Sequence, residues 1–148
     1  GFSVCKDDEI SNGAKLAAEI SSVYCEATTA KISLIFGRAC GGIYTALAAK
    51  GTSADIVLST EKGVVSPLSP EAAAIVMFGE RIKAGESIDA LSKEYEEKFG
   101  SALYAAEKGY IDEIISESEI RVKLSAALDA LDSKRESRPA KKHTDFPF

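Results

Sequence analysis

The sequence predicts an α/β fold with mostly parallel strand pairing, and three observations support this. The 148 residues alternate between short apolar runs, typical of buried strands, and longer segments with a three- and four-residue apolar period, typical of helices. The longer segments carry helix-start and helix-stop residues at their ends. Strands separated by helices pair in parallel, because a helical crossover returns the chain to the same end of the sheet. The length fits one domain. With about four strands the sheet is incomplete, so we expect a piece of a larger protein or a chain that relies on a partner.

Four segments are predicted as strands. They are short, mostly apolar and bounded by turn residues, as buried strands are. They lie at residues 31–36, 54–59, 63–67 and 110–115. The third is expected to stop at Pro67, because the residue before a proline avoids the α region.

Six segments between and around the strands are predicted as helices. They lie at residues 10–27, 43–50, 69–85, 87–100, 101–109 and 116–136. Ser69 is a predicted N-cap, followed by Pro70 at the first helical position and by Glu71 near the positive helix end. Ser116 and Glu119 have the spacing of a capping box. Three of the helices are predicted to end at a glycine, namely Gly51, Gly100 and Gly109.

Composition and charge exclude several classes of protein. The chain is 45% hydrophobic and 28% charged, as ordinary globular proteins are. No apolar run approaches the ~20 residues that cross a bilayer, and the N-terminus lacks a signal-peptide pattern. We therefore expect a protein of the cytoplasm or of an organelle matrix. The formal net charge of −5 argues against nucleic-acid binding. Residues 133–148 form a basic tail with five Lys or Arg against two acids, which suits solvent or an acidic partner.

Residues for acid–base or metal chemistry are scarce. The single histidine, His143, lies among lysines in the tail, so no Ser-His-Asp order and no histidine-based metal motif is possible. Cys5, Cys25 and Cys40 form no zinc pattern, which favours free thiols in a reducing compartment. Cys40 has no histidine near it in sequence to activate it as a nucleophile. The sequence predicts no metal site and contains no glycine-rich phosphate loop.

The glycine pair in "RACGGIYT" is the remaining candidate for chemistry. It stands between a predicted strand and a predicted helix, so the amides of Gly42 and Ile43 fall near a helix start. The first amides of a helix lack partners and carry partial positive charge. Aimed at a developing oxyanion, one such donor is worth ~3 kcal/mol. Turn formation alone also explains a glycine pair, so spacing leaves both interpretations open.

Several motifs resemble the carboxyltransferase component of biotin-dependent acyl-CoA carboxylases and of related decarboxylases and transcarboxylases. That family carries AEAT-P-K before a strand, R-K-A-Y-G-G-A-Y at a turn and GAD before the next strand. The similar segments here are "EATTAK" at residues 26–31, "RACGGIY" at 38–44 and "SAD" at 53–55. The closing signature of the family resembles the segment from Arg121 to His143. The likeness covers essentially the whole chain, with Cys40 at a position that is often aromatic in the family.

The resemblance implies a fold and a place within it. The family has the crotonase-like fold of the ClpP/crotonase superfamily, a superhelix of β-β-α units, and its carboxyltransferase holds two such domains. Residues 1–148 would be the C-terminal portion of the C-terminal domain, and residues 133–148 its basic tail. The chain would then be a partial domain.

The resemblance also implies a function and a set of site residues. The chain would be the biotin-site half of a carboxyltransferase that moves a carboxyl group between carboxybiotin and an acyl-CoA, such as acetyl- or propionyl-CoA. The backbone amides of Gly42 and Ile43 would form an oxyanion hole that stabilises the biotin enolate. Thr45 would stand where the family tunes acyl-chain preference. The residues of the biotin and substrate pocket would be Gly41, Tyr44, Thr45 and Glu71.

Cofactor and partners follow from the same resemblance. The cofactor would be biotin, held as carboxybiotin on a biotin carboxyl carrier protein, and acyl-CoA would be the substrate. The chain would join a homo- or hetero-oligomer with the acyl-CoA-binding half, and would work with a biotin carboxylase. Two alternatives stay open: a subunit of a biotin-dependent decarboxylase or transcarboxylase, and a catalytically inactive assembly fragment. The isolated chain is expected to be inactive, because the acyl-CoA site belongs to the other half.

Overall fold

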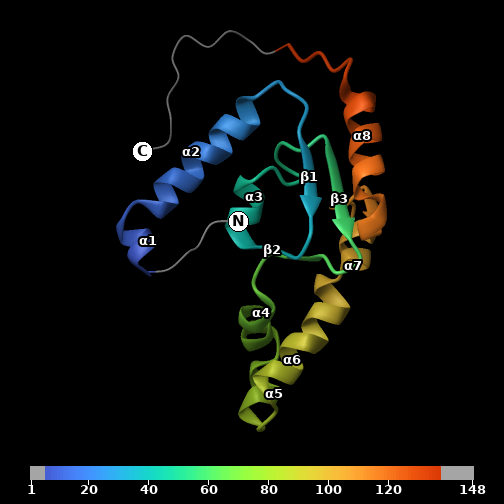
Figure 1. Cartoon of the computed structure of the whole chain (residues 1–148). Coiled ribbons are helices and arrows are strands. Elements are labelled where there is room, and N and C mark those ends of the chain that lie inside the picture. Colours follow the sequence, from blue (N-terminus) through green and yellow to red (C-terminus); the bar gives the residue numbers. More distant parts are fainter. Residues whose placement is uncertain (1–5, 138–148) are drawn as a thin grey trace.

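Two small parallel sheets form the centre of the protein, whose computed structural model describes residues 6–137 (Figure 1). The first sheet has the order β1-β3-β5, and its strands are β1 (Ile32–Ile35), β3 (Ile56–Thr60) and β5 (Glu113–Ile115). The second sheet pairs β2 (Arg38–Cys40) with β4 (Val64–Ser66). All three strand pairings are parallel, which confirms the predicted mode of pairing.

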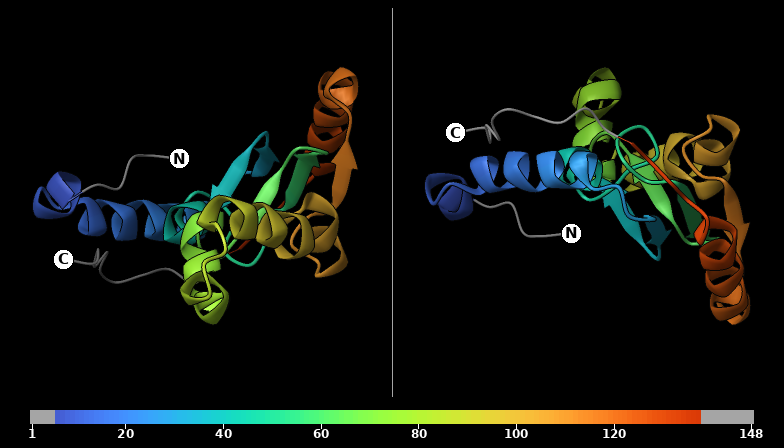
Figure 2. Two further views of the ribbon diagram at one scale, coloured as in Figure 1. Left: turned by 90° about the horizontal axis from the view of Figure 1, so that it is seen from below. Right: turned by 90° about the horizontal axis from the view of Figure 1, so that it is seen from above.

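The helices surround the sheets and extend well beyond them. They are α1 (Lys6–Ile10), α2 (Gly13–Glu26), α3 (Gly41–Ala46), α4 (Pro70–Met77), α5 (Gly79–Lys83), α6 (Ile88–Tyr95), the π-helix η1 (Glu96–Gly100), α7 (Ala102–Glu107), the 3₁₀ turn η2 (Glu117–Glu119) and α8 (Ile120–Leu131). Helices α4, α5 and α6 form an arm that projects from one end of the sheets (Figure 1). Helices α2 and α8 lie on opposite sides of the sheets in every view (Figure 2).

The core lies between the two sheets and α7. Its buried members are Ile35, Val57, Val65, Ala102, Ala105 and Ile111. Burial of a large apolar side chain contributes about 1.5–3 kcal/mol, so this cluster holds the sheets against the helix. Tyr44 of α3 packs against the same cluster. That contact connects α3, which begins with the glycine pair, to the buried core.

The two predicted helix caps are confirmed. The Ser69 hydroxyl accepts a hydrogen bond from the Ala72 amide at 3.2 Å, and Pro70 is the first residue of α4. The Ser116 amide donates to the Glu119 carboxylate at 3.0 Å, which completes the predicted capping box. Such caps satisfy amides that have no partner within the helix.

Strand β2 and the end of α3 differ from the prediction. Residues 38–40 form a strand that was not predicted, because a three-residue strand gives no periodicity and pairs with a distant segment. The helix predicted at residues 43–50 instead begins at Gly41 and ends at Ala46. The chain leaves the helix at Ala48, which has φ 64° and whose carbonyl accepts a 2.6 Å hydrogen bond from the Ser33 hydroxyl of β1. The prediction that Gly51 ends this helix was therefore wrong.

The arm also departs from simple helices. The helix predicted at residues 69–85 is divided at Phe78, where φ is −115°, into α4 and α5. The helix predicted at 87–100 ends in a π-helical turn. Gly100 ends it as predicted, and a Cβ at this position would lie only 3.3 Å from Val64 Cγ1.

Helix α2 forms where the apolar period predicted it, yet none of its residues is buried. Leu16 and Val23 are 59% and 51% exposed. Asn12, in the left-handed conformation with φ 73°, separates α2 from α1.

Within residues 6–137 no helix is both long and apolar enough to cross a membrane. Of the residues considered above, Cys5 and His143 lie outside the described part of the chain, as does most of the basic tail.

Candidate functional site

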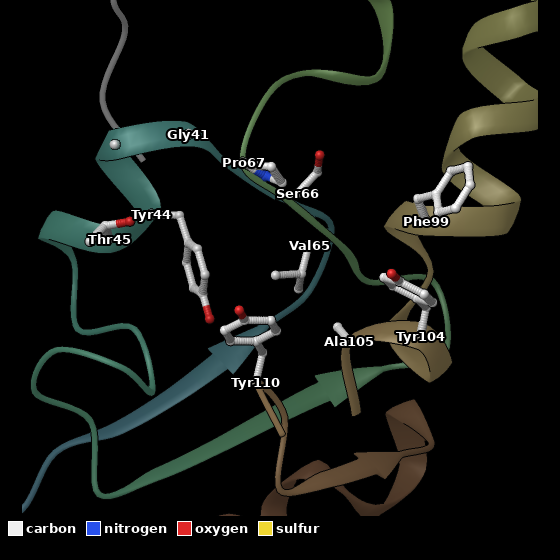
Figure 3. Close-up of a pocket in the computed structure, with 11 residues that line it drawn as sticks. Gly41, Tyr44, Thr45, Val65, Ser66, Pro67, Phe99, Tyr104, Ala105 and Tyr110 are labelled. Carbon is white, nitrogen blue, oxygen red and sulfur yellow. The ribbon is translucent and has the colours of Figure 1, made fainter. Parts of the chain in front are cut away.

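A pocket of about 370 Å³ lies where α3, β4 and α7 meet (Figure 3). Strands β2 and β4 run parallel with Cys40 opposite Ser66, so the chain leaves both strands side by side, at Gly41 and at Pro67. These two exits form one wall of the pocket. Parallel strands commonly present binding residues where they end, because the following loops gather at one edge.

Four of the six predicted site residues line this pocket, namely Gly41, Gly42, Tyr44 and Thr45. Ile43 faces a second cavity of about 530 Å³, between α3 and the strands β1 and β2. Glu71 lines neither cavity. The structure therefore brings together the predicted residues of α3 and separates them from Glu71.

The positions of Gly41 and Gly42 differ in whether they could hold a residue other than glycine. Gly41 has φ +73°, a conformation that costs other residues about 1–2 kcal/mol, so the backbone itself calls for glycine there. Around Gly42 no atom lies within 4 Å of where a Cβ would stand. Because α3 begins at Gly41, the amides of Gly42 and Ile43 fall in its first turn, where helical amides have no carbonyl partner. Gly42 therefore brings a first-turn amide to this pocket, while Ile43 belongs to the wall of the second cavity.

Aromatic rings form the opposite wall. Phe99 comes from the π-helix, Tyr104 from α7 and Tyr110 from the loop before β5 (Figure 3). The rings of Phe99 and Tyr104 meet edge to face with centroids 5.9 Å apart, and Lys108 Nζ lies 5.4 Å from the Tyr104 centroid. Sequence reasoning missed these residues because they follow the glycine pair by more than fifty positions. The only local signal was the spacing of aromatic residues from Tyr95 onward.

Two buried hydroxyl groups near the pocket have different surroundings. The Ser66 hydroxyl forms a 2.8 Å hydrogen bond with the Tyr95 hydroxyl and accepts the Leu68 amide at 3.3 Å. The Tyr44 hydroxyl is buried, the Lys50 amide approaches its oxygen, and no described residue accepts a hydrogen bond from it. Burial raises the pKa of Tyr44, an effect that the approaching Lys50 amide offsets only in part. Tyr44 thus keeps its proton at neutral pH.

The carboxyl transferase domain model matches residues 1–146 of the chain. The chain belongs to the carboxyl transferase domain family. The 12S subunit of methylmalonyl-CoA carboxyltransferase from Propionibacterium freudenreichii subsp. shermanii is 35% identical over 134 residues, which are 88% of this chain and 26% of that protein. The alpha subunit of methylmalonyl-CoA decarboxylase from Propionigenium modestum is 34% identical, over 88% of this chain and 26% of that protein. The propionyl-CoA carboxylase carboxyltransferase subunit of Haloferax mediterranei is 31% identical, over 100% of this chain and 30% of that protein.

Solved structures of family members share the fold. Transcarboxylase 12S, solved as a hexamer assembly with methylmalonyl-coenzyme A and methylmalonic acid bound, matches with a TM-score of 0.88 and 31% identity over 100% of this chain and 29% of that one. The beta subunit of geranyl-CoA carboxylase from P. aeruginosa matches at 19% identity with a TM-score of 0.75, which shows the fold alone. These likenesses confirm the predicted crotonase-like α/β class. The chain spans between a quarter and a third of the length of these relatives.

The other segments that carry the family resemblance meet at Asp55. Its carboxylate accepts the Lys31 amide at 2.8 Å and Lys134 Nζ at 2.8 and 3.0 Å. Lys50 Nζ joins the Asp55 carbonyl, at 2.8 Å, to the Asp112 carboxylate, at 2.7 Å. We call Lys31, Lys50, Asp55, Asp112 and Lys134 the Asp55 cluster. It connects α2, β1, β3, β5 and the segment after α8, so these residues of the family motifs have a structural role.

The electrostatics of the Asp55 cluster favour its charged form. Burial acts to raise the pKa of Asp55, but the hydrogen bonds from Lys134 and the Lys31 amide outweigh it, so the pKa lies below its ordinary value. The pKa of Asp112 is likewise lowered, because hydrogen bonds from Lys50 and the Val57 amide exceed the opposing effect of burial. Lys134 is the first lysine of the predicted basic tail, and it is bound to the protein rather than free in solvent.

Glu71 belongs to an exposed ion cluster beside the pocket. Its carboxylate pairs with Arg38 of β2 at 2.9 Å, and Arg38 also pairs with Glu96 of η1 at 3.3 Å. The pKa of Glu71 lies below its ordinary value because of its own amide and of the bond from Arg38. Burial raises the pKa of the neighbouring Cys40 thiol, an effect that Arg38 only partly offsets, and this disfavours a nucleophilic thiolate. No metal-binding group of three or more His, Cys, Asp or Glu occurs within residues 6–137.

Proposed function

We propose that this chain supplies the biotin-side half of a carboxyltransferase that moves a carboxyl group between carboxybiotin and an acyl-CoA. Family membership supports the reaction class, and residues 1–148 would be the C-terminal portion of the C-terminal domain. The observation that carries the proposal is the glycine turn, in which Gly42 lines a pocket with aromatic walls and the amides of Gly42 and Ile43 stand in the first turn of α3.

The residues around the pocket suit biotin. Its volume of about 370 Å³ falls in the usual range for small-molecule pockets, roughly 300–1,000 Å³. The amides of Gly42 and Ile43 would hold the ureido oxygen, and Gly41 would set the direction of both. Tyr44 and Thr45 would bound the ring on the side of α3. Carboxybiotin would supply the carboxyl group, and the ring nitrogen that this group leaves would be able to take up the α-proton of the acyl-CoA, so no histidine is required of the chain.

In this proposal Glu71 does not line the pocket and acts through its ion pair with Arg38. It holds Arg38 at the start of β2 to the first turn of α4, across the segment that contains Pro67. Since Pro67 lies beside Gly41 in the same wall of the pocket, the ion pair would hold that wall in place. An exposed pair of this kind contributes little to stability, ~0–1 kcal/mol, so its effect would be on geometry.

The remaining parts of the enzyme would come from partners. The acyl-CoA and the groups that hold its thioester would belong to a complementary half, and the biotin would arrive on a carrier protein loaded by a biotin carboxylase. The relatives named above include carboxylase, decarboxylase and transcarboxylase subunits. The second candidate function, a decarboxylase or transcarboxylase subunit, has relatives at 35% and 34% identity, and carboxylase beta chains match at 34% as well, so identity supports both directions equally.

The test is carboxyl transfer with labelled carboxybiotin, measured for the chain alone and after reconstitution with an acyl-CoA-binding half. We expect no transfer by the chain alone and transfer to acetyl- or propionyl-CoA after reconstitution. Label moving only from methylmalonyl-CoA to biotin would favour the decarboxylase or transcarboxylase alternative. Turnover by the chain alone would contradict the division into halves, and none by the reconstituted enzyme in either direction would favour an inactive assembly fragment.

A further inference from the structure

We propose that the Tyr44 hydroxyl is a buried hydrogen-bond donor for the ligand of this pocket, and that Tyr110 is the movable side chain that covers it. This proposal rests on the proposed function, since it takes the pocket to be the site of a ureido ligand. It adds a side-chain donor to the two backbone amides, and it assigns a task to a residue that sequence similarity placed only near the site.

The Tyr44 hydroxyl is unusual among the buried polar groups of the protein. Within residues 6–137, only it and the Ser53 hydroxyl are buried side-chain polar atoms without a hydrogen-bond partner. Buried hydroxyls almost always find partners, because losing water without replacement is unfavourable. Tyr44 stays protonated at neutral pH, so its O–H is a donor that lacks an acceptor. A ligand atom that accepts a hydrogen bond from the Tyr44 O–H would satisfy this donor.

The hydroxyls of Ser66 and Tyr95, which bond to each other, provide a comparison with the Tyr44 hydroxyl. Ser66 also lines the pocket, but its hydroxyl is bonded to Tyr95 at 2.8 Å, and both residues are 4% exposed. The fold therefore satisfies one buried hydroxyl at this site internally and leaves the other open. This contrast supports a binding task for Tyr44.

The position of the Tyr44 hydroxyl is well defined. The ring packs against the core that contains Val57 and Val65, and Tyr44 alone among the lining residues borders both cavities beside α3. Its hydroxyl end points away from the α3 turn and toward Tyr110 (Figure 3). A donor held by core packing needs little reorganisation when a ligand binds.

Tyr110 is the side chain that can uncover this donor. Figure 3 shows the hydroxyl ends of Tyr44 and Tyr110 directed toward each other across the pocket. Tyr110 is 54% exposed, while its backbone is held by a 2.9 Å hydrogen bond from its amide to the Ala105 carbonyl. Rotation of an exposed side chain takes picoseconds to nanoseconds, so the cover can move without any change in the fold.

The chemistry of the pocket selects a class of ligand. The Gly42 amide can only donate, the buried Tyr44 hydroxyl lacks an acceptor for its proton, and the Ser66 hydroxyl is already bonded. A ligand that fits must carry acceptor oxygens on a compact apolar ring system. A cyclic urea meets this requirement, and a ring with only donor groups at its edge does not.

The test combines two measurements on the full chain, with free biotin as the probe. In Tyr44→Phe we expect a thermal midpoint equal to or above that of the wild type, because the buried O–H had no acceptor and the Lys50 amide makes no bond of normal geometry to it. We also expect biotin to bind about ten-fold more weakly, by calorimetry, as for the loss of one buried hydrogen bond. In Tyr95→Phe the midpoint should fall, because the buried Ser66 hydroxyl loses its partner. Tyr24→Phe, on α2, is the control for binding.

The outcomes separate this proposal from the proposed function. Biotin binding to the wild type and equally well to Tyr44→Phe would overturn the role of Tyr44 and leave the proposed function standing. A lowered midpoint in Tyr44→Phe would show that the hydroxyl is satisfied within the protein, and would also overturn it. No binding to the wild type would refute the proposed function and this proposal with it. Tyr110→Ala should speed biotin association, and an unchanged rate would overturn the covering role.

Discussion

The glycine turn and the Asp55 cluster both lie on segments that resemble the family motifs, yet they are built in opposite ways. In the Asp55 cluster, the Asp55 carboxylate and carbonyl oxygens all accept hydrogen bonds from within the chain. At the glycine turn, the amides of Gly42 and Ile43 lie in a helical first turn, and the Tyr44 hydroxyl nearby has no partner. Both regions carry residues that resemble the family motifs, but their hydrogen bonding indicates different roles.

The difference gives a physical criterion for sorting motif residues. A polar residue whose hydrogen bonds are completed inside the chain stabilises the fold, and its loss should be seen in unfolding. A polar group left open beside a pocket is unfavourable for the fold on its own, and its loss should be seen in binding or rate. Substitutions in the two regions should therefore change different measurements.

The largest expected effect follows removal of one open donor. Gly42→Pro deletes the amide hydrogen, and we expect carboxyl transfer by the reconstituted enzyme to fall about 100- to 1,000-fold, as for loss of one oxyanion donor. Gly42→Ala is the matched control, because it keeps the amide and its Cβ meets no atom within 4 Å. Equal rates for the two variants, with thermal melting to confirm folding, would refute the donor role.

The next effect is on stability, and it belongs to the other region. Asp55→Ala removes the acceptor of the Lys31 amide and the closest partner of Lys134, so unfolding should become easier by about 1–3 kcal/mol. Glu80→Ala is the matched control, since Glu80 forms only an exposed pair with Lys83 and should change stability by less than about 0.5 kcal/mol. Urea unfolding measures both. Similar losses in the two variants would contradict a structural role for Asp55.

A smaller loss of stability is expected within the glycine pair. Gly41→Ala places a side chain at φ +73° and should cost about 1–2 kcal/mol, although space is available, since its Cβ would lie 3.8 Å from the Pro67 carbonyl. Gly42→Ala should be nearly neutral in the same unfolding assay. If Gly42→Ala proved the more destabilising, the assignment of backbone strain to Gly41 would be wrong.

The smallest effect is a dependence of stability on pH. The pKa values of Asp55 and Asp112 are lowered by folding, so their contribution is complete above the unfolded value, near 3.9, and is lost as the pH falls toward their folded values. The free energy of unfolding should be nearly flat above about pH 5 and should decrease below it. Asp55→Asn should make that decrease shallower. An unchanged slope would show that Asp55 does not contribute.

The elements that the sequence predicted well are those decided by local chemistry. The caps at Ser69 and Ser116 and the buried strand at residues 56–60 follow from side-chain type and spacing alone. Strand β2, the break at Phe78 and the π-helix depend on contacts between distant segments, which periodicity does not contain. The exposed apolar residues of α2 show the same limit, since their spacing predicted a helix without showing what it packs against.

The candidate site was predictable only on one side. The glycine pair and Tyr44 stand together in the sequence, so a local motif could identify them. The aromatic wall comes from η1, α7 and the loop after α7, and only the fold brings it opposite α3. Glu71 was expected in the pocket but pairs with Arg38 outside it, because α4 turns its first residues toward β2.

The most direct test of the account is amide NMR of the ¹⁵N-labelled full chain during titration with biotin. We predict that the amide resonances of Gly42 and Ile43 shift downfield as the ligand oxygen accepts from them. The amides of Lys31 and Val57, which are bonded to Asp55 and Asp112, should not move. Shifts at the Asp55 cluster, with the Gly42 and Ile43 resonances unchanged, would contradict the account.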